Sequence, residues 1–378
     1  MCWCFRFLLV ITVEYILSMK RNKLLLIGPL PEPITGVSLA NKVVIDGLRA
    51  NGFKVETINT SYNKFEESLG GFSLRKALFF LKLNFQSYKI FKVNTVYITP
   101  GQTFFGIIKY ALFILLTKMC DKELIIHVHG NYLGKEYSQL EGVKKAIFKW
   151  LLSKTTKGIV LSESLKDNML PFIDDKQIFV LYNFVEDYLF SNKESVDNSK
   201  PKIVFLSNLM QEKGILDLLE ALLILETEDF VYEAKIAGNI DVKNRDVIQR
   251  YFNKLKNVEY CGVVSGIDKK KLLDWGNVFV LPTYYEMEGQ PISILEAMAT
   301  KNLILVTNHA GIPDIFEDGI NGFYVEKRNP QDIAMKIKKV FSTCDQSTYV
   351  RNHNYLTAIE KYKVDNFLNS LSKILLEL

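Results

Sequence analysis

The order strand, glycine-containing loop, helix, strand occurs near the start of this chain and again after residue 200. Near the start, an apolar strand at Asn22–Gly28 leads through a loop into a helix over Ser38–Arg49, and a strand follows at Lys54–Ile58. The order returns with a strand at Lys202–Leu206 and a helix at Ile215–Leu225. Short apolar runs that alternate with helices are typical of parallel sheets covered on both faces. The sequence therefore predicts an α/β fold with two doubly wound domains.

Segment boundaries follow from breaks in the apolar pattern. Between the two units, Tyr182–Lys202 is rich in Asp, Asn, Ser, Glu and Lys, which indicates a linker. We expect two Rossmann-like domains facing across a cleft, an N-terminal one over residues 19–185 and a C-terminal one over 186–354. Residues 1–18 form an N-terminal extension whose apolar run is too short to span a bilayer. It is either an upstream start before Met19 or a membrane-surface anchor.

Charge is distributed unevenly between the two halves. Residues 1–185 carry 24 Lys and Arg against 14 Asp and Glu, a net charge of +10, whereas residues 186–378 carry 23 against 28, a net charge of −5. A basic half predicts contact with an anionic surface. The apolar, lysine-containing stretches Leu74–Lys92 and Thr103–Lys118 are either core helices or one face of a lipid-contacting surface. No nucleic-acid module is evident. The five scattered cysteines favour neither a disulfide framework nor a zinc site and fit a reducing cytoplasm.

The segment after Val278–Pro282 carries two acids at a strand–loop–helix corner. The apolar run reads as a buried strand, and Pro291 is expected to open the next helix. Glu288 lies in the intervening loop and Glu296 lies on the helix, with seven residues between them. A helix N-terminus after a parallel strand suits an anion or sugar hydroxyls. The alternative is a simple loop acid and a helix acid favoured by the dipole.

This segment resembles the E-x7-E signature of the retaining glycosyltransferases of family 4, which have the GT-B fold. The first Glu of that signature corresponds to Glu288 and the second to Glu296. The resemblance implies that Glu288 binds hydroxyls of the donor sugar and that Glu296 binds the ribose. The rest of the run, Gly289, Gln290 and Pro291, is expected at the substrate as well. In that family the last helix, here about 355–378, packs back on the N-terminal domain.

A second landmark is the loop after Lys202–Leu206. Asn208 to Gly214 resembles the family's Gly-Arg-Leu…Glu-Lys-Gly loop, which implies that Lys213 is the cation at the departing β-phosphate. Asn208 stands where the family has Arg, so it can supply a hydrogen bond but no charge. An ordinary loop leading into a helix is the alternative.

Three further landmarks complete the expected site. Gly36, in the loop after the first strand, would let the backbone approach a phosphate, and Ser38 would cap the following helix. His129, at the end of the strand Leu124–Val128, corresponds to the family's donor-sugar histidine. Gly262 lies in a loop that resembles the one meeting the nucleobase.

The resemblance therefore implies a retaining hexosyltransferase of the bacterial surface-polysaccharide type, with Glu288, His129 and Lys213 as catalytic residues. Its partners would be a nucleotide sugar, a saccharide or lipid-linked oligosaccharide acceptor and an anionic membrane surface. Assembly of capsule, O-antigen or exopolysaccharide is the expected setting, in the cytoplasm or peripherally on the inner face of the plasma membrane. No metal or other cofactor is expected, since no D-x-D motif is placed for one. A GT-B epimerase or phosphorylase and a noncatalytic nucleotide-sugar-binding assembly protein remain the alternatives.

Overall fold

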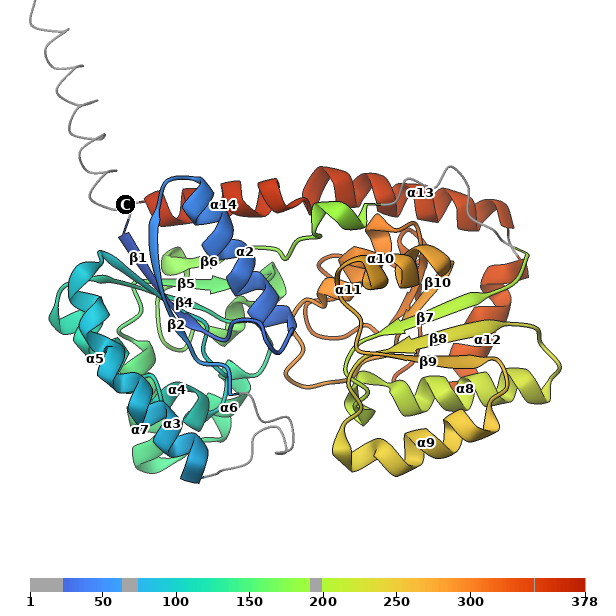
Figure 1. Ribbon diagram of the computed structural model, residues 1–378, viewed down its shortest axis with the longest axis horizontal. Coiled ribbons are helices and arrows are strands. Elements are labelled where there is room, and N and C mark those ends of the chain that lie inside the picture. Colours follow the sequence, from blue (N-terminus) through green and yellow to red (C-terminus); the bar gives the residue numbers. More distant parts are fainter. Residues whose placement is uncertain (1–22, 63–73, 191–198, 343, 378) are drawn as a thin grey trace, which may run out of the picture. The chain divides into compact units, whose positions relative to one another are not determined.

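The computed structural model describes residues 23–62, 74–190, 199–342 and 344–377, so the expected extension over residues 1–18 lies outside the described residues. The chain divides into two compact units (Figure 1). The first runs up to Leu181 and includes Leu368–Leu378, and the second spans Tyr182–Phe367. Each unit contains a six-stranded sheet whose paired strands are parallel. This confirms the predicted α/β class with two Rossmann-like domains.

The sheet of the first unit has the strand order β2-β1-β3-β4-β5-β6. Its strands are β1 (Lys23–Gly28), β2 (Lys54–Asn59), β3 (Thr95–Ile98), β4 (Glu123–His127), β5 (Lys157–Val160) and β6 (Ile178–Val180). The helices and 3-10 turns are α2 (Gly36–Ala50), α3 (Leu74–Asn84), η1 (Phe85–Lys92), α4 (Phe104–Ile108), α5 (Ala111–Met119), α6 (Leu133–Gln139), α7 (Gly142–Leu152), η2 (Glu163–Asn168) and η3 (Asp175–Gln177). The central strands are apolar along their length because helices cover both faces of the sheet.

The sheet of the second unit has the strand order β12-β11-β10-β7-β8-β9. Its strands are β7 (Lys202–Leu206), β8 (Glu233–Ala237), β9 (Val258–Gly262), β10 (Val278–Leu281), β11 (Leu303–Val306) and β12 (Gly322–Tyr324). The helices and turns are η4 (Asp187–Leu189), η5 (Gln211–Lys213), α8 (Ile215–Thr227), η6 (Val242–Asn244), α9 (Arg245–Lys254), α10 (Gly266–Trp275), α11 (Ile292–Ala299), α12 (Pro330–Ser342) and α13 (Cys344–Lys361). Over the described ranges, no helix is long and apolar enough to cross a membrane.

The strand order of each sheet reverses at one point. In the second unit the chain runs outward from β7 through β8 to β9 and then returns to the other side of β7 with β10. In the first unit the reversal lies between β1 and β3. Ligands of open parallel sheets bind beyond the carboxyl ends of the strands at such a switch point. In the second unit, the loops after β7 and β10 therefore flank the preferred binding position.

Two helices begin at other residues than the sequence suggested. The N-cap of α2 is Thr35, whose Oγ1 accepts from the Ser38 backbone N–H at 3.1 Å, while Ser38 Oγ accepts from the Thr35 N–H at 2.8 Å. Ser38 is thus the third helical residue of a capping box, not the cap expected for it. Pro291 is the N-cap of α11, one residue before the helix that it was expected to open.

The last helix, α14 (Val364–Leu376), packs on α2 and β5 of the first unit. A Cβ added at Gly47 of α2 would lie 2.3 Å from Leu368 Cδ1, so the two helices are in close contact. Lys157 Nζ donates to the carbonyl oxygens of Ile374 and Glu377 at 2.7 and 2.5 Å. A cation at carbonyls that the helix leaves without a partner is stabilising. The expected helix over 355–378 is two helices, because α13 ends at Lys361.

Candidate functional site

The loops after β7 and β10 pack tightly against each other in the second unit. Gly214 has φ +77°, and a Cβ there would lie 2.3 Å from the Pro282 carbonyl oxygen. Only glycine adopts this conformation at so close an approach without strain. The Glu212 carbonyl accepts from the Tyr284 N–H at 2.8 Å and from Thr283 Oγ1 at 3.3 Å. The backbone therefore holds the two loops together at the topological switch point.

Lys213 and Glu288 meet at this junction. Lys213 Nζ lies 2.6 Å from Glu288 Oε2, and Thr283 Oγ1 donates to the same oxygen at 3.0 Å. The Lys213 ammonium also lies 5.1 Å from the centroid of the Tyr285 ring. Both partners are largely buried, with side chains 14% and 8% exposed. The structure thus brings together the two residues that were assigned to the β-phosphate and to the sugar, and they neutralise each other here.

Glu296 forms a second buried pair, with Lys269 of α10. Lys269 Nζ lies 2.5 Å from Glu296 Oε1 and 3.1 Å from Glu186 Oε2. Burial raises the pKa of the Glu296 carboxyl, and Lys269 opposes that shift. Burial acts to lower the pKa of Lys269, but Glu296 and Glu186 raise it overall, so the ammonium keeps its proton. Glu296 is therefore more than a helix acid facing solvent, because a fixed cation occupies one of its oxygens.

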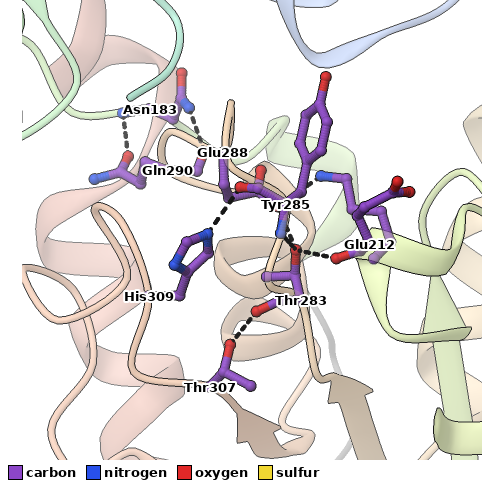
Figure 2. Close-up of polar contacts among 9 residues, drawn as sticks. Asn183, Glu212, Thr283, Tyr285, Glu288, Gln290, Thr307 and His309 are labelled. Atoms are coloured by element: carbon purple, nitrogen blue, oxygen red, sulfur yellow. Dashed lines mark hydrogen bonds and ion pairs between the residues drawn. The ribbon is translucent and has the colours of Figure 1, made fainter. Parts of the chain in front are cut away.

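Hydrogen bonds hold the remaining residues of the Glu-Gly-x-Pro run, and Figure 2 shows those between Asn183 and Gln290. The Asn183 N–H donates to Gln290 Oε1 at 2.6 Å, and Asn183 Nδ2 donates to the Gln290 carbonyl at 2.8 Å. The Gly289 carbonyl accepts from the Gly311 N–H at 3.1 Å. The buried Gln290 side chain thus anchors the loop, and Pro291 completes it as the N-cap of α11.

Two residues expected in the second unit lie apart from these pairs. Asn208 is exposed in the loop after β7, and its carbonyl accepts from the Met210 N–H at 2.9 Å. Gly262 ends the edge strand β9 with φ +69°, and a Cβ there would meet open space. The carbonyl of Gly262 accepts from the Gly238 N–H at 2.8 Å. Neither Asn208 nor Gly262 forms a hydrogen bond or ion pair with Lys213 or Glu288 in the described part of the chain.

In the first unit, His129 follows β4 and lies against a second histidine. The rings of His127 and His129 have centroids 3.9 Å apart, and the Tyr97 hydroxyl lies 2.6 Å from His127 Nδ1. Burial lowers the pKa of His129 to about 3 and lowers that of His127 well below its ordinary range. Both Nε2 atoms are buried without a hydrogen-bond partner among the described residues. His129 is thus a neutral side chain, available for an uncharged hydroxyl. Gly36 is exposed at the first position of α2.

Sequence reasoning missed two residues that contact predicted ones, Lys269 at Glu296 and Thr283 at Glu288, and a third that contacts Tyr285 in the loop before Glu288. Lys269 lies on α10, and Thr283 directly follows the run Val278–Pro282. The third is His309, whose Nε2 lies 2.8 Å from the Tyr285 carbonyl and whose Nδ1 lies 3.1 Å from Lys327 Nζ. Because the carbonyl accepts, Nε2 carries the proton, and burial lowers the pKa of this imidazole. His309 lies in the loop after β11, directly before Ala310–Pro313, and β11 pairs with β10. This position was the signal that could have identified it.

No group of three or more His, Cys, Asp or Glu side chains among the residues that the structure describes is placed to hold a metal ion.

Comparison with known proteins adds the class of the second unit. Residues 200–343 match the family described as Glycosyl transferases group 1. This stretch is a group 1 glycosyltransferase domain. It contains Lys213, Glu288 and Glu296, so both buried ion pairs belong to a glycosyltransferase domain. The match supports glycosyltransferase activity for the chain.

Individual relatives extend over more of the chain. An uncharacterized glycosyltransferase of Methanocaldococcus jannaschii is 26% identical over 369 residues, covering 89% of this chain and 93% of its own length. The putative colanic acid biosynthesis glycosyltransferase WcaL of Salmonella typhimurium is 30% identical over 154 residues, 39% of this chain and 37% of WcaL. The crystal structure of Anabaena HepE in complex with UDP and glucose superposes with a TM-score of 0.70 at 15% identity, covering 94% and 99% of the two chains. At that identity the likeness shows the shared GT-B fold alone.

Proposed function

We propose that this protein is a retaining hexosyltransferase of family 4 type that uses a nucleotide-diphosphate sugar as donor. The observation that carries the proposal is the Lys213–Glu288 pair at the switch point of the group 1 domain. A cation and a carboxylate at this position match the two ends of the bond that must break, a diphosphate and a sugar ring. HepE, which shares the fold, was crystallised with UDP and glucose, which supports a nucleotide-sugar donor.

Binding of the donor would separate the ion pair. Lys213 turns from Glu288 to the β-phosphate, where negative charge grows as the glycosidic bond breaks. Glu288 is then free to accept hydrogen bonds from sugar hydroxyls, and Thr283 keeps its carboxylate in place. Glu296 accepts from the ribose with the oxygen that Lys269 leaves open. His129, neutral across the physiological range, contacts the donor sugar.

The transfer itself needs no residue as nucleophile. The bond between the anomeric carbon and the β-phosphate oxygen breaks, and the acceptor oxygen attacks from the same face of the sugar. The acceptor proton passes to the departing phosphate oxygen, so the configuration is retained. We propose that the reaction is independent of metal ions, with Lys213 and the helix N-termini offsetting the diphosphate charge.

For the acceptor we propose a lipid-linked oligosaccharide of a bacterial surface polysaccharide, such as capsule, O-antigen or exopolysaccharide. The relative named for colanic acid biosynthesis and the basic half of the chain support this assignment. The reaction would then take place on the cytoplasmic face of the plasma membrane.

A noncatalytic nucleotide-sugar-binding protein is the second candidate. The observation that favours it is Asn208, which stands in place of the cation expected beside Lys213. With a single lysine, itself paired with Glu288, the ligand-free site carries no net positive charge from these two groups. A GT-B epimerase, which would also bind a nucleotide sugar, is the third candidate.

The deciding experiment incubates the protein with labelled UDP-glucose, UDP-galactose, UDP-N-acetylglucosamine or GDP-mannose and bacterial membrane lipids. A glycolipid product whose new linkage has the donor's anomeric configuration by NMR supports the proposal. Epimerised nucleotide sugar would identify an epimerase, and tight donor binding without turnover would identify a binding protein. A parallel series with EDTA is expected to retain full activity, and loss of transfer that Mg²⁺ or Mn²⁺ restores would overturn metal independence.

A further inference from the structure

A row of exposed apolar side chains runs along α3 and the adjoining turn η1 of the first unit. Its members, which we call the α3–η1 row, are more than half exposed, and Phe85 is the most exposed at 83%: Leu78, Leu81, Phe85, Tyr88 and Phe91. Their spacing of three or four residues places them on one side of the helical path. The opposite side is buried through Leu83 and Ile90. The row is therefore not required for the core of this unit.

Single exposed apolar residues are ordinary, but a contiguous row is not. Five large side chains in succession, three of them aromatic, form an extended apolar strip. Such a strip on a polar-rimmed surface marks a place where another body binds. The charge around the row indicates which body that is.

The charges in this part of the chain are all positive. Between Ser68 and Cys120 the sequence contains seven Lys or Arg and no Asp or Glu. Lys82 and Lys92 lie beside the row and are exposed, and neither forms an ion pair with an acid among the described residues. Lys92 instead lies 5.1 Å from the Tyr88 ring centroid.

We propose that the α3–η1 row docks on an anionic lipid bilayer. An anionic bilayer offers head groups for the lysines and, directly beneath them, an apolar layer for the leucine and aromatic side chains. Lysine stems lie along apolar surface while their ammonium groups reach the head groups. The aromatic residues suit the boundary between head groups and chains, where their ring systems prefer to lie.

The neighbouring helix α5 differs from this row. It packs against η1 but buries Phe113, Ile114 and Thr117 in the core of the first unit. Of the two lysine-containing stretches in the sequence, Thr103–Lys118 therefore fits the core-helix alternative. The stretch Leu74–Lys92 presents a row of five exposed apolar side chains, whereas Thr103–Lys118 exposes Phe105 and Leu112. The docking surface is accordingly assigned to α3 and η1 alone.

This inference rests on the proposed function in one respect, the lipid-linked acceptor. Docking would hold the protein at the surface where that acceptor resides. A vesicle without acceptor tests the surface by itself, because no sugar transfer is involved. Failure of docking and failure of transfer are therefore separate results.

The experiment measures binding of the full chain to vesicles of phosphatidylcholine alone and of phosphatidylcholine with phosphatidylglycerol, by co-sedimentation at 50 and 500 mM NaCl. The first variant, Phe85→Ser with Phe91→Ser, removes apolar area, and its matched control is Val231→Ser with Met335→Ser, exposed apolar positions of the second unit. The second variant, Lys82→Glu with Lys92→Glu, reverses charge, and its control is Lys243→Glu with Lys256→Glu. Thermal melting verifies that each variant is folded.

We expect the unmodified chain to bind the anionic vesicles at low salt and to be released at high salt. Each lysine near the surface contributes about fivefold in affinity, so the charge reversal should weaken binding at least tenfold. The Phe double variant should weaken binding by a similar factor, while both controls bind as the unmodified chain does. Binding to anionic vesicles that neither row variant weakens would overturn the proposal. Absence of binding by the unmodified chain to anionic vesicles would also overturn the proposal. So would a result in which the unmodified chain forms a dimer, the row variants do not, and none of them binds vesicles.

Discussion

Lys213 and Glu288, which lie 75 residues apart in the sequence, form a largely buried ion pair between the loops after β7 and β10, with Nζ 2.6 Å from Oε2. Both residues were assigned to different parts of one substrate. In the ligand-free protein each serves as the other's counter-charge. Donor binding therefore exchanges one set of charge interactions for another, and the pair's contribution to stability can be separated from its contribution to turnover.

Replacing Lys213 tests this separation. Lys213→Met should lower kcat by about a hundredfold or more, as removing one preorganised stabiliser does. It should also destabilise the second unit by about 3 kcal/mol, because the Glu288 carboxylate is left without its cation. Adding Glu288→Gln should restore much of the stability measured by urea unfolding, but not the turnover. A Lys213→Met enzyme with near-normal kcat would show that Asn208 and the backbone suffice.

Glu296 is expected to act in nucleotide binding. Glu296→Ala should weaken binding of a nucleoside diphosphate by about 1.5–3 kcal/mol, the range for hydrogen bonds to a charged group. Isothermal titration calorimetry measures this change, and Lys269→Met serves as comparison because it removes the partner and leaves the carboxylate. Unchanged affinity in Glu296→Ala would mean that the acid only pairs with Lys269.

Acid should destabilise the first unit through His127 and His129. Burial lowers the pKa of His129 to about 3 and also lowers that of His127. In the unfolded chain both histidines have a pKa of about 6.5, so below that pH the unfolded chain binds more protons than the folded one. The two histidines therefore do not reduce the free energy of unfolding above a pH of about 6.5. Below that pH the free energy of unfolding falls by about 1.4 kcal/mol per pH unit for each histidine, until the pH approaches their folded-state pKa values. Urea unfolding at pH 7.5, 6.5 and 5.5 measures the slope. A His129→Gln variant should show a shallower slope, and an equal slope would exclude this histidine as the source.

Contact between α2 and α14 should be sensitive to a single methyl group. Gly47→Ala places a Cβ 2.3 Å from Leu368 Cδ1, and overpacking of this kind costs about 1–3 kcal/mol. Leu368→Ala in the same chain provides room, so the double variant should be less destabilised than the sum of the two single changes. Additive losses in thermal unfolding would show that the contact is relieved by movement elsewhere.

The parts of the fold that follow from local pattern could be predicted from the sequence. The strand Lys202–Leu206 was placed at its observed bounds, and the run Val278–Pro282 exceeds β10 by one residue, because a strand buried on both faces is a short, bounded apolar run. Helix starts were less accurate, since Thr35 rather than Ser38 caps α2 and either residue type can cap.

The interactions of the site could not be read in the same way. Lys269 meets Glu296 and Glu186 across 27 and 83 residues of sequence, and only the tertiary structure brings these side chains together. His309 is likewise brought to Tyr285 by the adjacency of β10 and β11. The residue types of the E-x7-E run were visible, but the partners that hold them were not. The sequence pattern shows which side chains can take part in the chemistry. Only the tertiary structure shows which charged groups pair with them in the ligand-free protein.

The anchoring of α14 by Lys157 has a consequence for how the protein is made. The helix that completes the first unit is encoded after the whole of the second, so a ribosome must release about 200 further residues before Lys157 receives its carbonyl partners. During synthesis the α14-facing side of α2 and β5 therefore stays uncovered until the whole of the second unit has been translated. The first unit is therefore the first to begin translation but is completed only after the second unit has been translated.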